Sequence, residues 1–325
     1  MSETTSVRRT ATTGTDRPET FSHEALLYGG LDEFTAATTA FIREGLDAAE
    51  PVLVVVDTTK IMALQGALGA DAGRVRFEDM NVVGSNPARI IPAWREFVNQ
   101  HAASGHPFRG IGEPISEPGT PANLVESQRH ESLLNLAFEG PPFWRLLCPY
   151  DVNHLSADVI EEAFRSHPTI RSNGKAVASD SYRDLAAVAA PFDLPLAPPT
   201  VTPEVATFEL GSLSDVREFV GSRAVAFGMS PAKAGDLVLS LNEIATNSLR
   251  HGGGNGTLRL WSEDDQLICE IQDTGHIDRP MIGRERPLPG STGGLGVWLA
   301  NQLCDLVQIR TFPEGSVVRI YMRIE

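Results

Sequence analysis

Cysteine is scarce in this sequence, since its 325 residues include only Cys148, Cys269 and Cys304. An odd, scattered set without metal-ligand spacing excludes a disulfide framework and fits a reducing compartment, with the thiols packed as small apolar groups. Long apolar runs are missing too, because none approaches the ~18 residues of a membrane span. The first 20 residues contain an Arg pair but no apolar segment after it. We therefore expect a disordered tail over 1–20, no secretory signal and a cytoplasmic protein that does not bind a membrane.

Positive charge is also in deficit, with 27 Lys and Arg against 42 Asp and Glu and a net charge of -15. This balance argues against direct nucleic-acid binding through a broad basic surface, because phosphate neutralisation needs clustered cations. It does not exclude a bound nucleotide, whose phosphates can be held by backbone N–H groups and a metal ion. No GxxxxGK[ST] motif occurs in the sequence, so we expect no P-loop.

Residues 21–170 alternate between short apolar runs and segments with helical spacing of apolar residues. The run PVLVVVD (51–57) is typical of a strand buried on both faces, and it follows the helical pattern of residues 32–50. The alternation continues to SADVIEEAFRSHP (156–168). It predicts an α/β domain with a mainly parallel sheet, to which we assign residues 21–184.

The composition then changes. PFDLPLAPPTVTPEV (191–205) contains five prolines and almost no periodicity, so we predict a semi-rigid Pro-rich linker over 185–204. Residues 205–325 follow with the patterns of a strand, two helices, a hairpin, a glycine-rich segment with a helix directly after it (together 291–307) and a closing strand. Helices beside a mostly antiparallel sheet are typical of an α+β two-layer sandwich.

The predicted helix over 236–250 carries two polar side chains one turn apart, Glu243 and Asn247. At about 100° per residue they share a stripe with Asp236, Ser240 and Arg250. The opposite side, which should face the core, is formed by Leu237, Leu241, Ile244, Ala245 and Ser248. Such a stripe is usually the solvated face of an amphipathic helix. Only the segments that follow it in the sequence favour a binding site instead.

Two of those neighbours follow downstream. Asp273 continues the alternating series Leu267, Cys269, Ile271 at a strand end, so we expect it to be partly buried and to need a hydrogen-bond donor. Thr274 and Gly275 allow a tight turn after it. In STGGLG, three glycines precede a predicted helix, where backbone N–H groups and the helix dipole favour an anion.

In this order the three pieces resemble the nucleotide-binding motifs of GHKL ATPases, over roughly 205–325. LNEIATNSLRHG resembles the N box, DTG the adenine-binding box and TGGLG the second glycine box. The short spacing and the following LCDLV resemble the anti-sigma factor serine kinases of the RsbW and SpoIIAB type most. The resemblance implies ATP and Mg²⁺ as cofactors, a protein serine/threonine kinase activity, and a sigma factor or an antagonist protein as partner, with a homodimer left open.

The resemblance also implies roles for single residues. Asn247 would bind Mg²⁺, and a carboxamide oxygen is a hard ligand suited to it. Glu243 would act as general base near the γ-phosphate, and Asp273 would accept from the adenine amine. The backbone at Gly275 would approach the base. Three glycines would cradle the phosphates as a mobile lid, namely Gly293, Gly294 and Gly296.

Two departures leave alternatives open. After DTG the family often has a second glycine, where this sequence has His276 and Ile277, and the lid segment HIDRPMIGRERPLPGS (276–291) is short and contains proline. Both favour weak catalysis, so a non-catalytic ATP-binding interaction module is one alternative. A sensor histidine kinase is another, because His130-Glu131 superficially resembles a phosphoacceptor site. That pair lies inside the α/β domain, however, and no pair of long helices leads into the C-terminal domain.

The N-terminal half is similar to MEDS-type sensory domains, regarded here as RecA/KaiC-like modules. The residues that carry the resemblance are SHEALLY, PVLVVVD and LLCPYDVNHLSADVIEEAFRSHP. Four residues are candidates for a ligand pocket, although they are equally typical of satisfied polar and aromatic side chains at strand ends: His23, Tyr28, Tyr150 and His167. The resemblance implies that this half senses a signal and controls the C-terminal domain.

Overall fold

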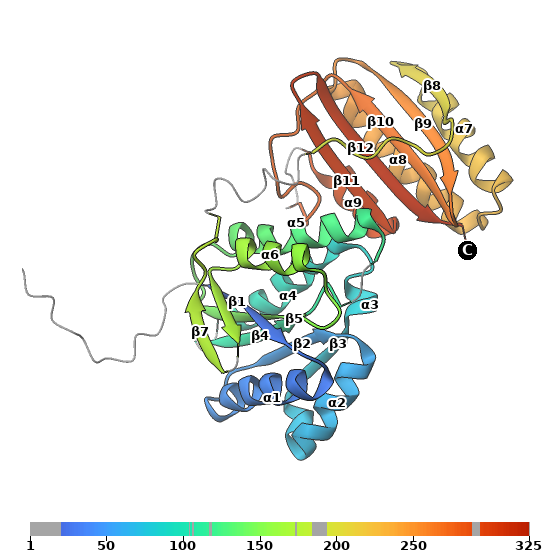
Figure 1. Cartoon of the computed structure of the whole chain (residues 1–325). Coiled ribbons are helices and arrows are strands. Elements are labelled where there is room, and N and C mark those ends of the chain that lie inside the picture. Colours follow the sequence, from blue (N-terminus) through green and yellow to red (C-terminus); the bar gives the residue numbers. More distant parts are fainter. Residues whose placement is uncertain are drawn as a thin grey trace, which may run out of the picture.

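The structure is a computed structural model that describes residues 21–103, 105, 107–116, 119–172, 174–183, 194–287 and 293–324. The tail predicted over 1–20 therefore lies outside the described residues, as does the first part of the predicted linker. The described chain folds into two domains that lie against each other (Figure 1). No helix within these ranges has both the length and the apolar character to cross a membrane.

The N-terminal domain is built on one sheet, in which the described residues form seven strands in the order β3-β2-β4-β5-β1-β6-β7. The strands are β1 (Ser22–Tyr28), β2 (Val52–Val56), β3 (Arg76–Asp79), β4 (Phe108–Gly112), β5 (Trp144–Asp151), β6 (Thr169–Ser172) and β7 (Lys175–Ala178). All neighbours are parallel except β6 and β7. The predicted mainly parallel sheet is confirmed, while the β6–β7 hairpin was not predicted.

Helices cover both faces of this sheet, which is why β2 is buried along its whole length. They are α1 (Leu31–Asp47), α2 (Thr58–Leu68), α3 (Met80–Val83), α4 (Ile90–Ala102), α5 (Pro121–Ala137) and α6 (Ala157–Ser166), with 3₁₀ turns at Gly69–Arg74 and Pro87–Arg89. Side chains of α1 and α2 form one apolar core with the sheet. Those of α3 to α6 form the second core on the opposite face, around Trp94 and Trp144.

The C-terminal domain is a two-layer sandwich, as predicted. In the described residues its antiparallel sheet has the order β11-β12-β10-β9-β8, and three helices cover one face. The elements are β8 (Glu204–Glu209), α7 (Leu213–Ala226), α8 (Pro231–His251), β9 (Asn255–Glu263), β10 (Gln266–Asp273), α9 (Leu295–Leu303), β11 (Leu306–Phe312) and β12 (Gly315–Arg323). The helix predicted after the glycines of 291–307 is present as α9, but it ends at Leu303, because Leu306 and Val307 already belong to β11.

The Pro-rich segment lies on the second face of the C-terminal sheet, and its described part crosses the strands before β8 begins (Figure 1). Two arginines of the sheet hold it by donating to its backbone. Arg310 Nε bonds the Leu194 oxygen at 3.2 Å, and Arg319 Nη1 bonds the Ala197 oxygen at 2.8 Å. The described residues of the segment, from 194 on, therefore pack on the C-terminal sheet.

The two domains meet where α9 ends. Arg89 donates from Nε to the Asn301 oxygen at 2.8 Å and from Nη2 to the Cys304 oxygen at 3.0 Å. The fully buried Asn86 also donates to the Cys304 oxygen, at 3.2 Å. These bonds satisfy carbonyl groups that a helix C-terminus leaves unpaired, and the guanidinium charge suits the negative end of the helix dipole.

Beside the carboxyl ends of the parallel strands, a buried carboxylate depends on two partners. Glu113 has no exposed side-chain surface, accepts from Tyr28 Oη at 2.5 Å and pairs with Lys60 Nζ at 2.7 Å. Burial raises the pKa of Glu113 to about 7, against the opposing effect of Lys60. The folded chain therefore holds a proton on Glu113 more tightly than the unfolded chain does.

The pH dependence of stability should report this group. With a usual pKa of 4.5 in the unfolded chain, the contribution of Glu113 is fully present below that pH and is lost as the pH rises to about 7. The loss amounts to up to about 3 kcal/mol. Glu113→Gln is neutral throughout, so between pH 5 and 7 the urea-unfolding free energy of the natural chain should fall relative to that of the variant. Parallel pH profiles for the two proteins would contradict this assignment.

Candidate functional site

A cavity of about 570 Å³ opens in the C-terminal domain between the end of α8, the end of β10, the lid segment and the start of α9. This size is ordinary for a small-molecule site. Its lining residues are Asn247, Arg250, His251, Gly252, Asp273, Gly275, His276, Ile277, Asp278, Arg279, Ile282, Gly293, Gly294 and Val297. The three sequence motifs thus converge on one space, although they are separated by up to about fifty residues in the chain.

Helix α8 presents the polar pair because its other side is fixed in the core. The helix begins at a Ser230 cap, whose Oγ accepts from the Lys233 nitrogen at 3.3 Å, with Pro231 in its first turn. The predicted core face is confirmed, since all five of its residues are buried. The predicted polar stripe is only partly exposed to solvent. Ser240 is buried, and its Oγ lies 3.3 Å from Sγ of Cys304, which directly follows α9. Asn247 remains half-buried at the cavity.

Asp273 stands half-buried at the end of β10, as expected, and its carboxylate accepts two hydrogen bonds. Ser248 Oγ donates at 2.5 Å and the Gly275 nitrogen donates at 2.8 Å. Gly252 packs directly against the carboxylate, because a Cβ at residue 252 would lie 2.4 Å from Asp273 Cγ. At Gly275 a Cβ would lie 2.6 Å from a backbone oxygen of the α8 end. Both positions therefore require glycine for this close approach.

The glycine loop divides into two parts. Gly293 and Gly294 have φ values of +86° and +89°, line the cavity and lead into α9. Gly296 does not line the cavity; it lies in the first turn of α9, and a Cβ there would be 2.9 Å from Glu243 Cβ. Its lack of a side chain lets α9 approach α8 at Glu243, and Glu243 is not among the residues that line the cavity. Within the described residues, the side chains of Glu243 and Asn247 make no hydrogen bond or ion pair.

The described part of the lid segment, residues 276–287, forms the outer wall of the cavity. It is held to β11 through Thr311, whose Oγ1 accepts from the Ile277 nitrogen at 3.3 Å and donates to the Ile277 oxygen at 3.0 Å. Arg279 on this wall points to the glycine loop, since its Nη2 lies 3.7 Å from the place where a Cβ of Gly293 would be. With Arg250, it gives the cavity two exposed guanidinium groups that suit phosphate.

Arg279 was not singled out in the sequence, because no motif or spacing marks it. Its position depends on how the lid segment folds back toward the glycine loop. An arginine between the adenine-binding box and the glycine box was the only available signal.

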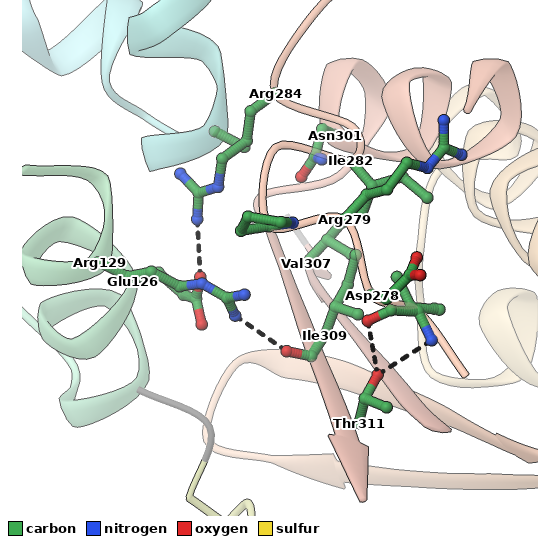
Figure 2. Close-up of a pocket in the computed structure, with 13 residues that line it drawn as sticks. Glu126, Arg129, Asp278, Arg279, Ile282, Arg284, Asn301, Val307, Ile309 and Thr311 are labelled. Carbon is green, nitrogen blue, oxygen red and sulfur yellow. Dashed lines mark hydrogen bonds and ion pairs between the residues drawn. The ribbon is translucent and has the colours of Figure 1, made fainter. Parts of the chain in front are cut away.

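A second, smaller cavity of about 290 Å³ lies on the other side of the lid segment, between the domains (Figure 2). Residues 277–279 and Ile282 line both cavities. From the N-terminal domain, α5 reaches the small cavity with Glu126 and Arg129. Residues 277–282 therefore act as one wall shared by the cavity of the C-terminal domain and the domain interface.

The lid segment is bound to α5 by a buried ion cluster. Glu126 accepts from Arg284 Nη2 at 2.8 Å and from Arg310 Nη1 at 2.9 Å, and the three side chains are at most 6% exposed. Arg129 Nη1 donates to the Ile309 oxygen at 3.0 Å (Figure 2). Glu285 adds an ion pair with Arg95 of α4. The position of the lid segment thus depends on the docking of the N-terminal domain.

The residues predicted to line an N-terminal pocket separate into two places. His23 and His167 lie together, with ring centroids 4.0 Å apart, and Tyr150 packs on His167 at 5.5 Å. Tyr28 lies elsewhere, bonded to Glu113. Burial lowers the pKa of His23 to about 4, so its ring is neutral at pH 7.

His130, the residue that resembled a phosphoacceptor, is 0% exposed. Burial lowers its pKa to about 3. It has no access to a phosphate donor unless α5 moves.

Comparison with known proteins agrees with this architecture. Residues 22–168 match the family described as MEDS, the MEthanogen/methylotroph, DcmR Sensory domain, and residues 206–322 match the histidine kinase-like ATPase domain. No curated protein matches the chain significantly. Among solved structures, the histidine kinase AdeS of Acinetobacter baumannii shares 11% identity over 38% of this chain and 70% of that chain, with a TM-score of 0.25, which is too low to bear on function. The chain therefore joins an N-terminal MEDS domain to a C-terminal histidine kinase-like ATPase domain.

Proposed function

We propose that the chain is an ATP-binding signalling protein whose C-terminal domain acts as an anti-sigma-type serine kinase. It would phosphorylate a serine of a protein antagonist, sequester a sigma factor, or do both, under the control of the N-terminal domain. The single observation that carries the proposal is the convergence of Asn247, Asp273, Gly275 and the Gly293–Gly294 turn on one cavity. The further likeness of the N-terminal half to RecA/KaiC modules stays a prediction.

Each part of the cavity suits one part of ATP. The Asp273 carboxylate keeps lone pairs beyond the two bonds it accepts, so it can receive the exocyclic amine of adenine. The backbone of Gly293 and Gly294 and the guanidinium groups of Arg250 and Arg279 suit the phosphates. Asn247 is free of protein partners among the described residues and would be the ligand for Mg²⁺, which supplies charge neutralisation on the phosphates when bound.

Asn247→Ala should weaken ATP binding mainly when Mg²⁺ is present, because the variant loses a metal ligand. The measurement is an ATP titration by calorimetry, with and without Mg²⁺. Asn242→Ala is the matched control, since Asn242 is the same residue type on the same helix but bonds Arg217 outside the cavity, at 2.9 Å. Equal losses in both variants, or a loss that ignores Mg²⁺, would count against the assignment.

Glu243→Ala should keep ATP affinity within a few-fold and reduce phosphoryl transfer by about 10²- to 10⁴-fold, because it removes only the general base. The assay combines the same titration with single-turnover transfer from labelled ATP to a candidate antagonist. If the variant loses ATP binding while transfer per bound ATP is unchanged, the roles given to Glu243 and Asn247 are wrong.

The chemistry of the label tests the class of function. Serine-linked phosphate on the antagonist is stable in acid and supports the kinase. Acid-labile phosphate on the chain itself would support a histidine kinase instead. ATP binding without any transfer would support the non-catalytic interaction module, which His276 and Ile277 favour by standing where the family often has a second glycine after DTG.

Control by the N-terminal domain would act through the shared wall. Docking of α5 holds Arg284 and Arg310 against Glu126, and the same lid segment carries Arg279 toward the glycine loop. A signal that shifts α5 would therefore change both the lid segment and the phosphate side of the cavity. Lid segments of this kind commonly limit nucleotide exchange.

Glu126→Gln should speed both ATP association and ATP dissociation several-fold. The variant leaves two buried guanidinium groups without their counter-charge, which costs about 3–5 kcal/mol of docking energy. Stopped-flow exchange of a fluorescent ATP analogue gives the rates. Glu161→Gln is the control, because Glu161 forms an exposed ion pair with Arg165 in the same domain. Unchanged rates in a variant whose domains have come apart, as seen by small-angle scattering, would refute control through the lid segment.

A further inference from the structure

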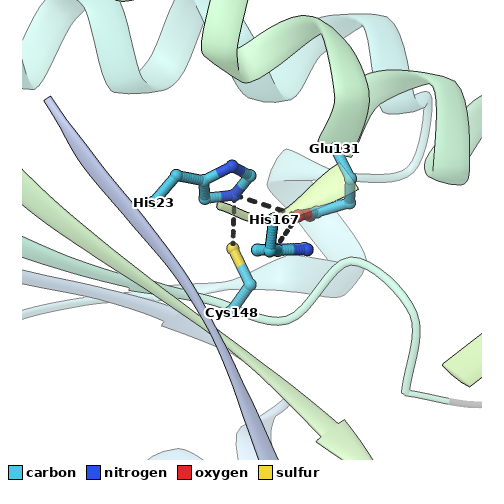
Figure 3. Close-up of side chains that lie close together, drawn as sticks. All are labelled: His23, Glu131, Cys148 and His167. Carbon is cyan, nitrogen blue, oxygen red and sulfur yellow. Dashed lines mark hydrogen bonds and ion pairs between the residues drawn. The ribbon is translucent and has the colours of Figure 1, made fainter. Parts of the chain in front are cut away.

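Four side chains that can bind a metal ion meet inside the N-terminal domain (Figure 3). His23 comes from β1, Cys148 from β5, Glu131 from α5, and His167 directly follows α6. All four are buried, and one ligand atom from each lies within 4.8 Å of every other. Only His23 and His167 were singled out from the sequence, as candidates for a pocket. Glu131 and Cys148 could not be joined to them, because the four are separated by up to about 140 residues and share no ligand spacing.

The two imidazole rings are oriented from outside the cluster. Asn135 Nδ2 donates to the Ser166 oxygen at 2.7 Å, so Asn135 Oδ1 is the atom that faces His23 Nδ1, at 3.1 Å. His167 Nδ1 lies 2.9 Å from the Ala163 oxygen. Each Nδ1 must therefore carry a proton and donate it outward. Both Nε2 atoms then face inward, where they can offer a lone pair to a metal ion, as in metal sites whose histidines are fixed by a second hydrogen bond.

The inward atoms are all electron-pair donors. His23 Nε2 and His167 Nε2 lie 3.3 and 3.1 Å from the same carboxylate oxygen, Glu131 Oε2. Cys148 Sγ lies 3.3 Å from His23 Nε2. In the described chain, His167 Nε2 and both Glu131 oxygens have no hydrogen-bond partner of acceptable geometry, although these side chains are at most 1% exposed. Buried groups of this kind are costly unless they are paired or coordinate a metal.

We propose that these four side chains bind one divalent transition-metal ion of the zinc type in a closed, four-coordinate site. Two imidazole nitrogens, one carboxylate oxygen and one thiolate are borderline to soft donors, which favour zinc-like ions over Mg²⁺ and Ca²⁺. At bond lengths of about 2.0–2.3 Å, tetrahedral ligand atoms stand about 3.3–3.7 Å apart. Three of the separations here are 3.1–3.3 Å, and none exceeds 4.8 Å. On binding, the Cys148 thiol releases its proton to solvent.

The site would be structural or sensory, because four protein ligands leave no open position for a substrate. It also lies apart from the nucleotide cavity, and α5, which carries Glu131, carries Glu126 at the domain interface as well. Its test therefore does not depend on ATP binding, and either proposal can fail without the other.

The first experiment uses the full chain without a histidine tag. The protein purified from zinc-containing medium should contain one zinc ion per chain, as measured by inductively coupled plasma mass spectrometry. After unfolding with a chelator and refolding with Co²⁺, it should show the strong visible absorption of tetrahedral cobalt and a thiolate-to-cobalt charge-transfer band. If the protein retains neither zinc nor cobalt, the proposal is wrong, and the cluster is a hydrogen-bonded histidine–carboxylate network without a metal ion.

The second experiment locates the ion. Cys148→Ser should abolish the charge-transfer band and lower the affinity for Co²⁺ at least tenfold, whereas Cys269→Ser should leave both unchanged. Cys269 is the matched control, because it is equally buried but lies in the C-terminal domain. If Cys148→Ser does not fold, X-ray absorption of the natural zinc-loaded chain decides, with one sulfur and three nitrogen or oxygen neighbours expected. A zinc shell without sulfur would refute the site.

Discussion

The structure depends on a helix that is mostly buried from Glu126 onward and yet is largely polar. Helix α5 has no apolar stripe, and its buried residues include Glu126, Arg129, His130, Glu131 and Asn135. A helix of this kind is stable only if each polar side chain finds a partner, because an unpaired buried charge costs several kcal/mol. Toward the C-terminal domain the partners are arginines and a backbone oxygen. Toward the sheet of its own domain, Glu131 lies 3.1–3.3 Å from two histidines but makes no hydrogen bond within the described residues, which is why a bound metal ion is proposed there.

This constraint explains why the two domains form one unit. The Glu126 carboxylate pairs with Arg284 of the lid segment and with Arg310 of β11. Separation of the domains would therefore leave three charged side chains without their partners. The lid segment then has two attachments, one to α5 and one to β11 through Thr311. A wall fixed at both ends transmits displacement of either end to the cavity that it closes.

Sequence periodicity was enough to predict the elements that are buried either on both faces or on one face only. The doubly buried β2 and the two-sided α8 were found because a core imposes a repeat of apolar residues on them. The boundary between α9 and β11 was misplaced, because Leu303, Leu306 and Val307 continue an apolar run across the change from helix to strand. The β6–β7 hairpin was missed because its strands are short and β7 is exposed along its length.

Residues of the candidate site were predictable where the local helix or turn alone determines the position of the side chain. Asn247 on its helix and Asp273 before its turn are of this type, and the structure places both at one cavity. Arg279 and the Cys148–Glu131 pair could not be found in this way. Their neighbours are set by tertiary packing, and Cys148 in particular looked like an ordinary small apolar residue.

Helix α5 connects the two regions where function is proposed. Glu126 and Glu131 are five residues apart, which is about 7.5 Å along a helix axis and places them on different sides of it. One carboxylate faces the arginines of the ATPase domain and the other faces the buried histidines. A metal ion bound in the cluster would draw Glu131 toward the sheet. Glu131 and Glu126 belong to the same rigid helix, so such a shift would also act on Glu126 and on the lid segment that it holds. Buried polar packing on this one helix therefore connects the cluster inside the MEDS domain with the lid segment beside the ATPase cavity, and the proposed control would act through it.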